Sequence, residues 1–180
     1  MSNDPDLALV ERYRNGDTAA FTELVVRYQR PIYNASFWIL RKAEDANDIT
    51  QIVFLKVAER LDEYDPQYKF FSWIYRIAVN ESLNLLRRNG REEALDEEID
   101  LPALDTASPE RIVSEAQVSR RIQSALMSMP TNDRMVLTLR HFSECSYQEI
   151  AEILGLDEKT VKSRLFEARH RLREMLKDLR

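Results

Sequence analysis

Glycine and cysteine are scarce in this chain of 180 residues, which has three glycines and one cysteine. Sheet proteins use glycine at tight hairpin turns, so its scarcity favours helices joined by short connections. Cys145 has no partner for an internal disulfide, and one thiol with two distant histidines does not make a zinc site. We therefore interpret Cys145 as a small structural residue near a turn, with redox sensing as the alternative.

Long hydrophobic runs are absent as well, and none approaches the roughly 18 residues that span a bilayer. The first residues, MSNDPDLALVERYRNGD, have neither the basic start nor the apolar stretch of a secretory signal. The sequence also lacks a glycine-rich phosphate loop and a recognisable catalytic constellation. We therefore expect a cytoplasmic, non-enzymatic protein with no membrane insertion, no catalytic residues, no metal and no cofactor.

Charge is distributed unevenly along the chain, whose net charge is −5. Residues 92–115 carry nine acidic side chains and one basic side chain, net −8, whereas residues 156–180 carry eight basic and five acidic ones, net +3. The overall acidity therefore does not exclude nucleic acid as a partner. Two prolines and the absence of a helical period in GREEALDEEIDLPALDTASP are typical of an extended linker.

Hydrophobic periodicity predicts an all-α fold of two small helical domains joined by this acidic linker. In the N-terminal domain, residues 1–91, we expect helices from Pro5 to Asn15-Gly16, from about 18 to 40 after the cap Asp17, from about 44 to 61 and from about 69 to 88. Pro31 should kink the second of these helices or remove one of its hydrogen bonds. The linker is expected over residues 92–109.

The C-terminal domain, residues 110–180, is expected to contain four further helices. The first stops before Pro130, and a short one covers about 132–142. The sequence Ser146-Tyr147-Gln148-Glu149 has the form of a capping box and opens the third helix, which ends at Gly155. The last helix runs from about 157 almost to residue 180.

The clearest local pattern is a helix-turn-helix in residues 147–166. Ala151 lies four residues before Gly155 and Val161 lies six after it, a spacing that lets two helices cross closely around a tight turn. Polar and basic side chains cluster in the first turns of the last helix, where a recognition helix meets DNA. The candidate DNA contacts are Lys159, Thr160, Lys162, Ser163 and Arg164, with Arg169 and Arg171 as phosphate contacts. The alternative is an ordinary helical hairpin with a solvated charged face.

A second candidate surface lies on the helix expected over residues 69–88. Helical spacing puts Phe71 and Tyr75 on its core side and Trp73, Arg76 and Asn80 on the opposite side. Aromatic rings stack on unpaired bases, amides read base edges and cations hold the backbone, so this composition indicates single-stranded nucleic acid. With the preceding loop, the candidate set is Tyr64, Tyr68, Lys69, Phe70, Phe71, Trp73, Arg76, Asn80, Asn84 and Arg87. The alternative, equally open from composition, is that Trp73 packs against the second helix.

A third candidate surface lies on the helix expected over residues 44–61. Ile49, Val53, Val57 and Leu61 form its core stripe. The far side carries Asp48, Gln51, Ile52, Leu55 and Glu59. Two aliphatic side chains in an acidic and polar setting are typical of a docking patch for a basic protein partner. The alternative is that Ile52 and Leu55 pack under a neighbouring helix.

Four segments, in this order, resemble the extracytoplasmic-function sigma factors of bacteria, which belong to the sigma-70 family. Residues 9–29, LVERYRNGDTAAFTELVVRYQ, resemble the family's opening segment. Residues 45–61, DANDITQIVFLKVAERL, resemble the helix that docks on the clamp of the polymerase β′ subunit. Residues 70–80, FFSWIYRIAVN, resemble the promoter-melting segment, and residues 146–169, SYQEIAEILGLDEKTVKSRLFEAR, resemble the module that reads the −35 element.

The resemblance implies an alternative sigma factor, a non-enzymatic subunit that directs promoter recognition and transcription initiation. Its implied partners are bacterial core RNA polymerase (β and β′ subunits), promoter DNA and an anti-sigma factor, because no sensory domain is expected after the helix-turn-helix. Asp48 and Gln51 are the implied polymerase contacts, with Ile52 and Leu55 beside them. The loop from residue 64 to 71, with the face around Trp73, would open the −10 element and capture a flipped base. The linker would lie in the RNA-exit path.

This chain departs from the family pattern at two places. Ile52 and Val53 stand where many members have a glutamate and an alanine, and Asp65-Pro66-Gln67 replaces a commoner Arg-Gly run in the loop. The loop difference leaves the preferred −10 base open.

Two other classes of protein compete with the sigma factor. A free-standing helix-turn-helix regulator would usually bind palindromic DNA as a dimer, but the sequence shows no heptad seam for dimerisation. A helical RNA-binding module would account for Trp73 but would leave the helix-turn-helix unexplained. The sigma factor is therefore the favoured hypothesis.

Overall fold

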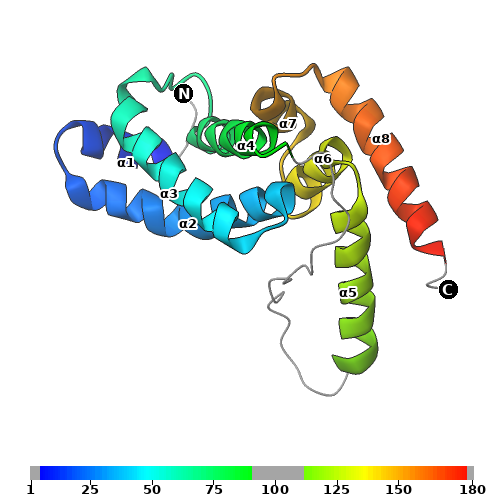
Figure 1. Cartoon of the computed structure of the whole chain (residues 1–180). Coiled ribbons are helices and arrows are strands. Elements are labelled where there is room, and N and C mark those ends of the chain that lie inside the picture. The colour runs from blue at the N-terminus through cyan, green and yellow to red at the C-terminus, as the bar shows by residue number, and fades with distance from the viewer. Residues whose placement is uncertain (1–4, 91–111, 178–180) are drawn as a thin grey trace.

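The computed structural model describes the backbone of residues 5–90 and 112–177 and the side chains of residues 5–90 and 120–177. The described backbone is helical and contains no strand. Its elements are α1 (Pro5–Arg14), α2 (Thr18–Leu40), α3 (Ala43–Arg60), the short 3-10 helix η1 (Leu61–Glu63), α4 (Phe70–Arg88), α5 (Ile112–Ser128), α6 (Thr131–His141), α7 (Tyr147–Leu154) and α8 (Glu158–Met175) (Figure 1). The all-α prediction is confirmed. The predicted linker, residues 92–109, lies outside the described residues.

The helices of the N-terminal half begin and end close to the predicted residues. Asp17 caps α2, because its carboxylate accepts a hydrogen bond of 3.0 Å from the Ala19 N–H. Gly16 follows α1 with a φ of 94°, a conformation that glycine adopts without strain. α2 continues through Pro31 to Leu40, so the proline does not end the helix.

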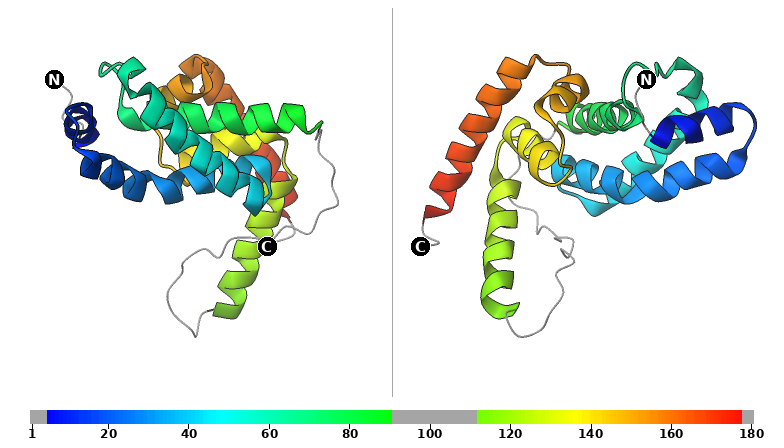
Figure 2. Two further views of the ribbon diagram at one scale, coloured as in Figure 1. Left: turned by 60° about the vertical axis from the view of Figure 1, so that its left-hand side comes forward. Right: turned by 180° about the vertical axis from the view of Figure 1, so that it is seen from behind.

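In the C-terminal half α6, α7 and α8 pack together, the end of α5 is buried against them, and the beginning of α5 extends away (Figures 1 and 2). The predicted capping box is present, since the Ser146 hydroxyl accepts from the Glu149 N–H and the Glu149 carboxylate accepts from the Ser146 N–H. Asp157 caps α8 by accepting a 2.8 Å hydrogen bond from the Thr160 N–H. These caps set the start of both helices of the helix-turn-helix.

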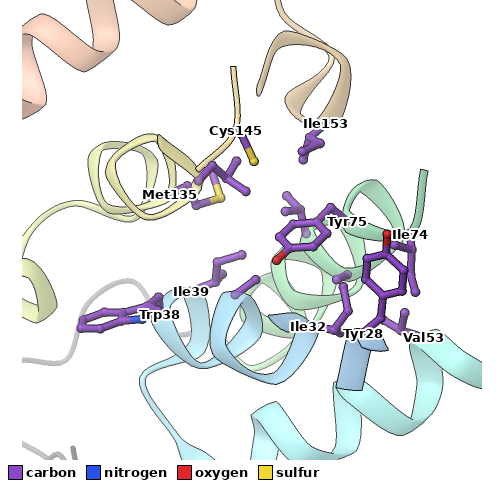
Figure 3. Close-up of a cluster of buried hydrophobic side chains, with 14 of the residues drawn as sticks. Tyr28, Ile32, Trp38, Ile39, Val53, Ile74, Tyr75, Met135, Cys145 and Ile153 are labelled. Carbon is purple, nitrogen blue, oxygen red and sulfur yellow. The ribbon is translucent and has the colours of Figure 1, made fainter. Parts of the chain in front are cut away.

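The two halves do not have separate cores. α4 packs against α7, and α2 packs against α6, so residues far apart in sequence lie side by side. Figure 3 shows Ile39 and Tyr75 from the N-terminal half pointing toward Met135, Cys145 and Ile153 from the C-terminal half. All five are buried in one continuous apolar cluster. The sequence predicted two domains but not this shared core.

Candidate functional site

The outward side of α3 carries the five predicted docking residues, which we call the α3 patch. Asp48, Gln51, Ile52, Leu55 and Glu59 are all exposed, with Ile52 at 36% and Leu55 at 62% of their full accessible area. The core stripe on the opposite side of α3 is buried as predicted. The two aliphatic side chains of the patch therefore do not pack under a neighbouring helix, and the alternative interpretation of them is wrong.

The outward side of α4 carries the polar part of the second predicted surface. We call the α4 face the set Lys69, Trp73, Arg76, Asn80, Asn84 and Arg87, of which Trp73 and Asn84 are half-buried and the others are exposed. Tyr68 is also exposed, and Phe71 is half-buried. Cations, amides and one ring therefore lie together along one side of a single helix. This combination can stack on a base and hold a phosphate backbone.

Tyr64 and Phe70 are core residues rather than surface residues. Both side chains are buried, Tyr64 at 3% and Phe70 at 0% exposure. Phe70 is the first residue of α4 and points inward. The ring centroids of Tyr64 and Phe70 lie 5.5 Å and 5.8 Å from the centroid of Trp73. They therefore form a rigid apolar floor under Trp73, which rests on these two rings.

The loop before α4 is held in place by hydrogen bonds that the sequence analysis did not foresee. The Arg14 guanidinium donates to the backbone oxygens of Leu61 at 2.6 Å and Tyr64 at 3.1 Å. The Tyr64 hydroxyl donates to the Tyr68 oxygen at 2.7 Å. The Asp65 carboxylate accepts from the Gln67 N–H at 2.9 Å and thereby closes the turn. No local sequence signal singles out Arg14, since its acceptors lie about fifty residues away.

The turn between α7 and α8 has the geometry of the predicted helix-turn-helix. Gly155 ends α7 with a φ of 64°, in the left-handed region. Val161, Leu165 and Ala168 are buried and fix α8 against the rest of the C-terminal half. The inward position of Val161 that the helix-turn-helix spacing predicted is therefore confirmed. The other side of α8 is left facing outward.

The predicted side chains on α8 lie on that outward side, which we call the α8 face. Lys159, Lys162, Ser163, Arg169 and Arg171 are exposed, whereas Thr160 and Arg164 are half-buried. The Thr160 hydroxyl is engaged, because it donates to the Asp157 carboxylate at 2.7 Å. Arg171 forms an ion pair with Asp133, and Arg169 lies 3.4 Å from the His141 ring.

Phe166 is a surface residue that the sequence analysis missed. It lies among the basic side chains of α8 and is 73% exposed. Apolar side chains on a recognition helix can contact the methyl group of thymine in the major groove, so Phe166 is a further candidate on the α8 face. The sequence signal that could have identified Phe166 as a surface residue is its position directly after the buried Leu165.

Cys145 is buried at 1% exposure in the shared core. Burial, reinforced by the nearby Glu149 carboxylate, raises the pKa of the Cys145 thiol to about 12. A thiol that stays protonated is a poor nucleophile and a poor redox sensor. This favours the structural interpretation of Cys145.

Among residues 5–90 and 120–177, no cluster of His, Cys, Asp and Glu side chains is arranged to hold a metal ion. No described helix is long and apolar enough to cross a membrane.

Two segments of the chain match known protein families. Residues 24–92 match the family described as Sigma-70 region 2, and residues 119–172 match Sigma-70, region 4. The first match contains the α3 patch and the α4 face, and the second contains the helix-turn-helix. Together they cover most of the chain.

Three relatives that are similar to this chain over nearly its whole length are named as RNA polymerase sigma factors. The chain is 32% identical to the RNA polymerase sigma-H factor of Pseudomonas aeruginosa, covering 99% of this chain and 97% of that protein. It is 31% identical to the ECF RNA polymerase sigma factor SigW of Bacillus subtilis, covering 94% and 96%. It is 34% identical to the ECF RNA polymerase sigma-E factor of Escherichia coli, covering 91% and 90%. Among solved structures, CnrH in complex with the cytosolic domain of CnrY is similar with a TM-score of 0.73 and 26% identity, covering 96% and 97%.

Proposed function

Because this chain belongs to the extracytoplasmic-function group of the sigma-70 family and is an alternative RNA polymerase sigma factor, we propose that its three surfaces divide the work of promoter recognition. In this proposal residues 1–91 bind core polymerase and the −10 element, residues 92–109 link the domains, and residues 110–180 bind the −35 element. Sigma factors are non-enzymatic initiation factors, so the chemistry of RNA synthesis belongs to the polymerase. The protein acts in the cytoplasm, where polymerase meets the promoter.

The α3 patch docks on the β′ subunit of core polymerase. Ile52 and Leu55 supply the apolar centre, and Asp48, Gln51 and Glu59 supply a polar, acidic rim suited to a basic partner. Apolar anchors surrounded by polar groups are the usual composition of a protein interface. The exposure of both aliphatic side chains is the observation that carries this proposal.

The α4 face binds the −10 element as a single strand. Trp73 stacks on an unpaired base, Asn80 and Asn84 read base edges, and Lys69, Arg76 and Arg87 hold the phosphates. Extruding a base costs a few kcal/mol, which the stacking and edge contacts offset. Tyr68 and Phe71 extend the face toward the loop. The buried Tyr64 and Phe70 contribute by supporting the Trp73 ring rather than by touching DNA.

The α8 face reads the −35 element in the major groove. Lys159, Lys162, Ser163 and Arg164 approach base edges and nearby phosphates, and Thr160, whose hydroxyl donates to the capping carboxylate of Asp157, approaches the backbone. Phe166 contacts a thymine methyl group. Arg169 and Arg171 lie further along α8 and contact phosphates. The net charge of +3 over residues 156–180 supports this role.

An anti-sigma protein regulates this factor in our proposal. The similar structure of CnrH was solved with the cytosolic domain of CnrY bound. A protein partner that covers the exposed α3 patch would prevent docking on polymerase. The exposed apolar pair Ile52 and Leu55 is the surface such a partner would compete for.

The test is reconstitution with bacterial core RNA polymerase. Wild-type protein should bind core polymerase in a pull-down and support promoter-directed transcription. A Gln51→Ala, Ile52→Glu double variant, which changes exposed residues, should fold normally but lose most of both activities. A failure of the wild type to bind, where a known sigma factor binds, would point instead to a free-standing DNA-binding regulator.

A further inference from the structure

A cavity of about 700 Å³ lies at the junction between the two halves, where α2, α4 and the end of α6 meet. α2 packs against both other helices, and Figure 1 shows its last turns beside α6. The lining residues of α2 include Arg27, Pro31, Asn34 and Trp38, which helical spacing puts on one side of that helix. From Arg27 to Trp38 this side is about 16 Å long, at about 1.5 Å per residue. The cavity therefore has the size of a small-molecule site, for which about 300–1,000 Å³ is usual.

Aromatic rings make up much of the lining of this cavity. Phe142, directly after α6, stacks on Trp38 with ring centroids 5.0 Å apart, yet Phe142 is 41% exposed. Tyr33 and Phe71 also line the cavity and are half-buried. A flat ligand that entered the cavity would cover ring surface that water now reaches, and this favours the binding of another aromatic ring. The rings therefore fit a nucleobase or a ring system of similar shape.

Thr138 of α6 brings to this cavity a hydroxyl that the protein itself does not use. The residue lines the cavity and is 3% exposed. Among the residues that the structure describes, none forms a hydrogen bond with the Thr138 hydroxyl. A buried hydroxyl is unfavourable while it stays unpaired, and most buried polar groups in proteins have a partner. A hydrogen-bonding group of a ligand in the cavity would supply the missing partner.

Two arginines, Arg27 and Arg30, line the cavity at the opposite end of α2 from Trp38. The Arg27 guanidinium donates to the carboxylate of Asp6, whose side chain is 7% exposed. This contact engages one of the three guanidinium nitrogens, and the Arg27 side chain is still 43% exposed. A guanidinium that a carboxylate holds from one side can bind a phosphate through its remaining N–H groups. This end of the cavity is therefore suited to an anionic group.

Glu144 adds a carboxylate to the lining from the C-terminal half. It has a φ of 53°, a left-handed conformation that is strained for a residue other than glycine, and strained residues of this kind cluster at binding sites. A carboxylate repels phosphate but accepts hydrogen bonds from the amino groups of adenine, guanine and cytosine, which uracil lacks. The anionic group of a ligand therefore belongs at the arginines of α2, and the amino group of its ring belongs at Glu144.

We propose that this cavity binds a free purine nucleotide. The base lies on the ring of Phe142, with its amino group on the Glu144 carboxylate and a ring nitrogen on the Thr138 hydroxyl. The phosphates lie at Arg27 and Arg30. The inference does not depend on the function proposed above. A nucleotide in this position contacts both halves of the folded chain, so it stabilises that fold by mass action.

The probe is ADP, titrated into the full chain without polymerase and followed by calorimetry and by tryptophan emission. Trp38 lines this cavity, whereas Trp73 lines a separate one between α4 and α7. ADP should quench the part of the emission that comes from Trp38 and should raise the melting temperature. Pyrophosphate, which lacks the base, and UDP, whose base lacks the amino group, should each bind at least about tenfold more weakly than ADP.

Thr138→Val removes the unpaired hydroxyl with little change of shape. It should weaken ADP binding about fivefold, the effect of one lost hydrogen bond, without lowering the melting temperature of the free protein. The matched control is Ser36→Ala, because Ser36 also has a buried hydroxyl without a partner among the described residues but does not line this cavity. Ser36→Ala should bind ADP as wild type does. Equal ADP affinity in Thr138→Val and Ser36→Ala would overturn the proposal.

A second variant, Glu144→Ala, tests recognition of the base from the other wall. It should bind ADP and UDP with about equal affinity, and it decides the question alone if the circular dichroism of Thr138→Val shows that this variant does not fold. Pyrophosphate that binds wild type as tightly as ADP would mean that only charge is recognised. Displacement of ADP by a mixed-sequence single-stranded DNA oligonucleotide would mean that the cavity takes a nucleotide unit of a strand. Either result, or the absence of ADP binding, overturns the proposal.

Discussion

The Lys69 ammonium lies 2.7 Å from the carboxylate of Glu149, a residue 80 positions further along the chain. Glu149 has two roles at once, because its other carboxylate oxygen accepts from the Ser146 N–H at 2.7 Å and so caps α7. Burial alone would raise the pKa of Glu149, but the hydrogen bonds from Lys69 and Ser146 outweigh it and lower that pKa below its ordinary value. One carboxylate therefore joins the start of the helix-turn-helix to the loop before α4.

Acid should loosen the junction through Glu149. A carboxyl whose pKa is lowered by its folded surroundings contributes stability above its ordinary pKa and loses it as pH falls through the lowered value. As pH falls below about 4, the tryptophan emission of wild type should therefore converge on that of Glu149→Gln, which cannot titrate there. A pH titration of both proteins checks this. A constant difference between them down to the point of global unfolding would contradict it.

Cys145 should be almost inert in the native protein. Its thiol has a pKa raised to about 12 by burial, whereas an ordinary thiol ionises near pH ~8.5. At pH 8 we expect alkylation by iodoacetamide to be at least about a hundredfold slower than in guanidinium chloride, since only the thiolate reacts. Because the pKa of Cys145 is raised in the folded form, the folded form loses stability as the pH rises through the ordinary thiol pKa, at which the unfolded chain begins to ionise. Rapid native alkylation would revive the redox-sensing alternative.

The apolar centre of the α3 patch should control affinity for core polymerase. Leu55→Glu places a charge at the centre of the proposed interface, and we expect polymerase affinity to fall at least tenfold, or about 1.4 kcal/mol. The matched control is Val26→Glu, because Val26 is a similarly exposed aliphatic residue, at 65%, on α2. Competition against a labelled sigma factor measures both. Equal losses in the two variants would remove the α3 patch as the docking site.

Two arginines of α8 should affect promoter binding differently. Arg164→Ala should cost about 1–3 kcal/mol at one position of the −35 element, as expected for a lost base contact. Arg171→Ala should weaken binding to all promoters alike and reduce the salt dependence by about one ion, as expected for a lost phosphate contact. Binding of holoenzyme to a set of single-base −35 variants measures both effects. If Arg164→Ala weakened binding equally for all −35 variants, Arg164 would contact the DNA backbone rather than a base.

Gly155 should be required for its backbone conformation rather than for space. Its φ is 64°, and no atom beyond the adjoining backbone lies within 4 Å of where a Cβ would stand. Gly155→Ala should therefore destabilise the protein by about 1 kcal/mol through backbone strain alone. Gly155→Asn should cost less, because asparagine tolerates the left-handed region better. Urea unfolding of the three proteins provides the comparison, and a larger cost for asparagine than for alanine would show that contacts, not strain, dominate.

Much of the secondary structure was predictable from local signals. Asp17, Ser146 with Glu149, Gly155 and Asp157 mark helix ends through hydrogen bonds and backbone angles that span only a few residues. The apolar stripe of α3 followed from helical spacing in the same way. Such features depend on neighbours in sequence, so the sequence displays them directly.

The orientation of α4 was only partly predictable. The spacing placed Phe71 toward the core, but Phe70 and Ile74 are the residues with no exposure at the start of this helix, and Phe71 is half-buried. Trp73 is half-buried rather than fully exposed, since it rests on Tyr64 and Phe70. A helix with apolar residues on several sides offers more than one way to bury them, and its neighbours decide between these ways.

The sequence by itself determined the all-helical fold, the ends of most helices and the helix-turn-helix, because periodicity and capping act over one or two turns. Only the tertiary structure decided that Arg14 fixes the loop before α4, that Arg134 lies between the ends of α2 and α5, and that Lys69 pairs with Glu149. Each of these contacts joins residues that the fold must first bring together. Carbonyl acceptors exist at every residue and charged partners are numerous, so the sequence contains no mark of which donor will reach which acceptor.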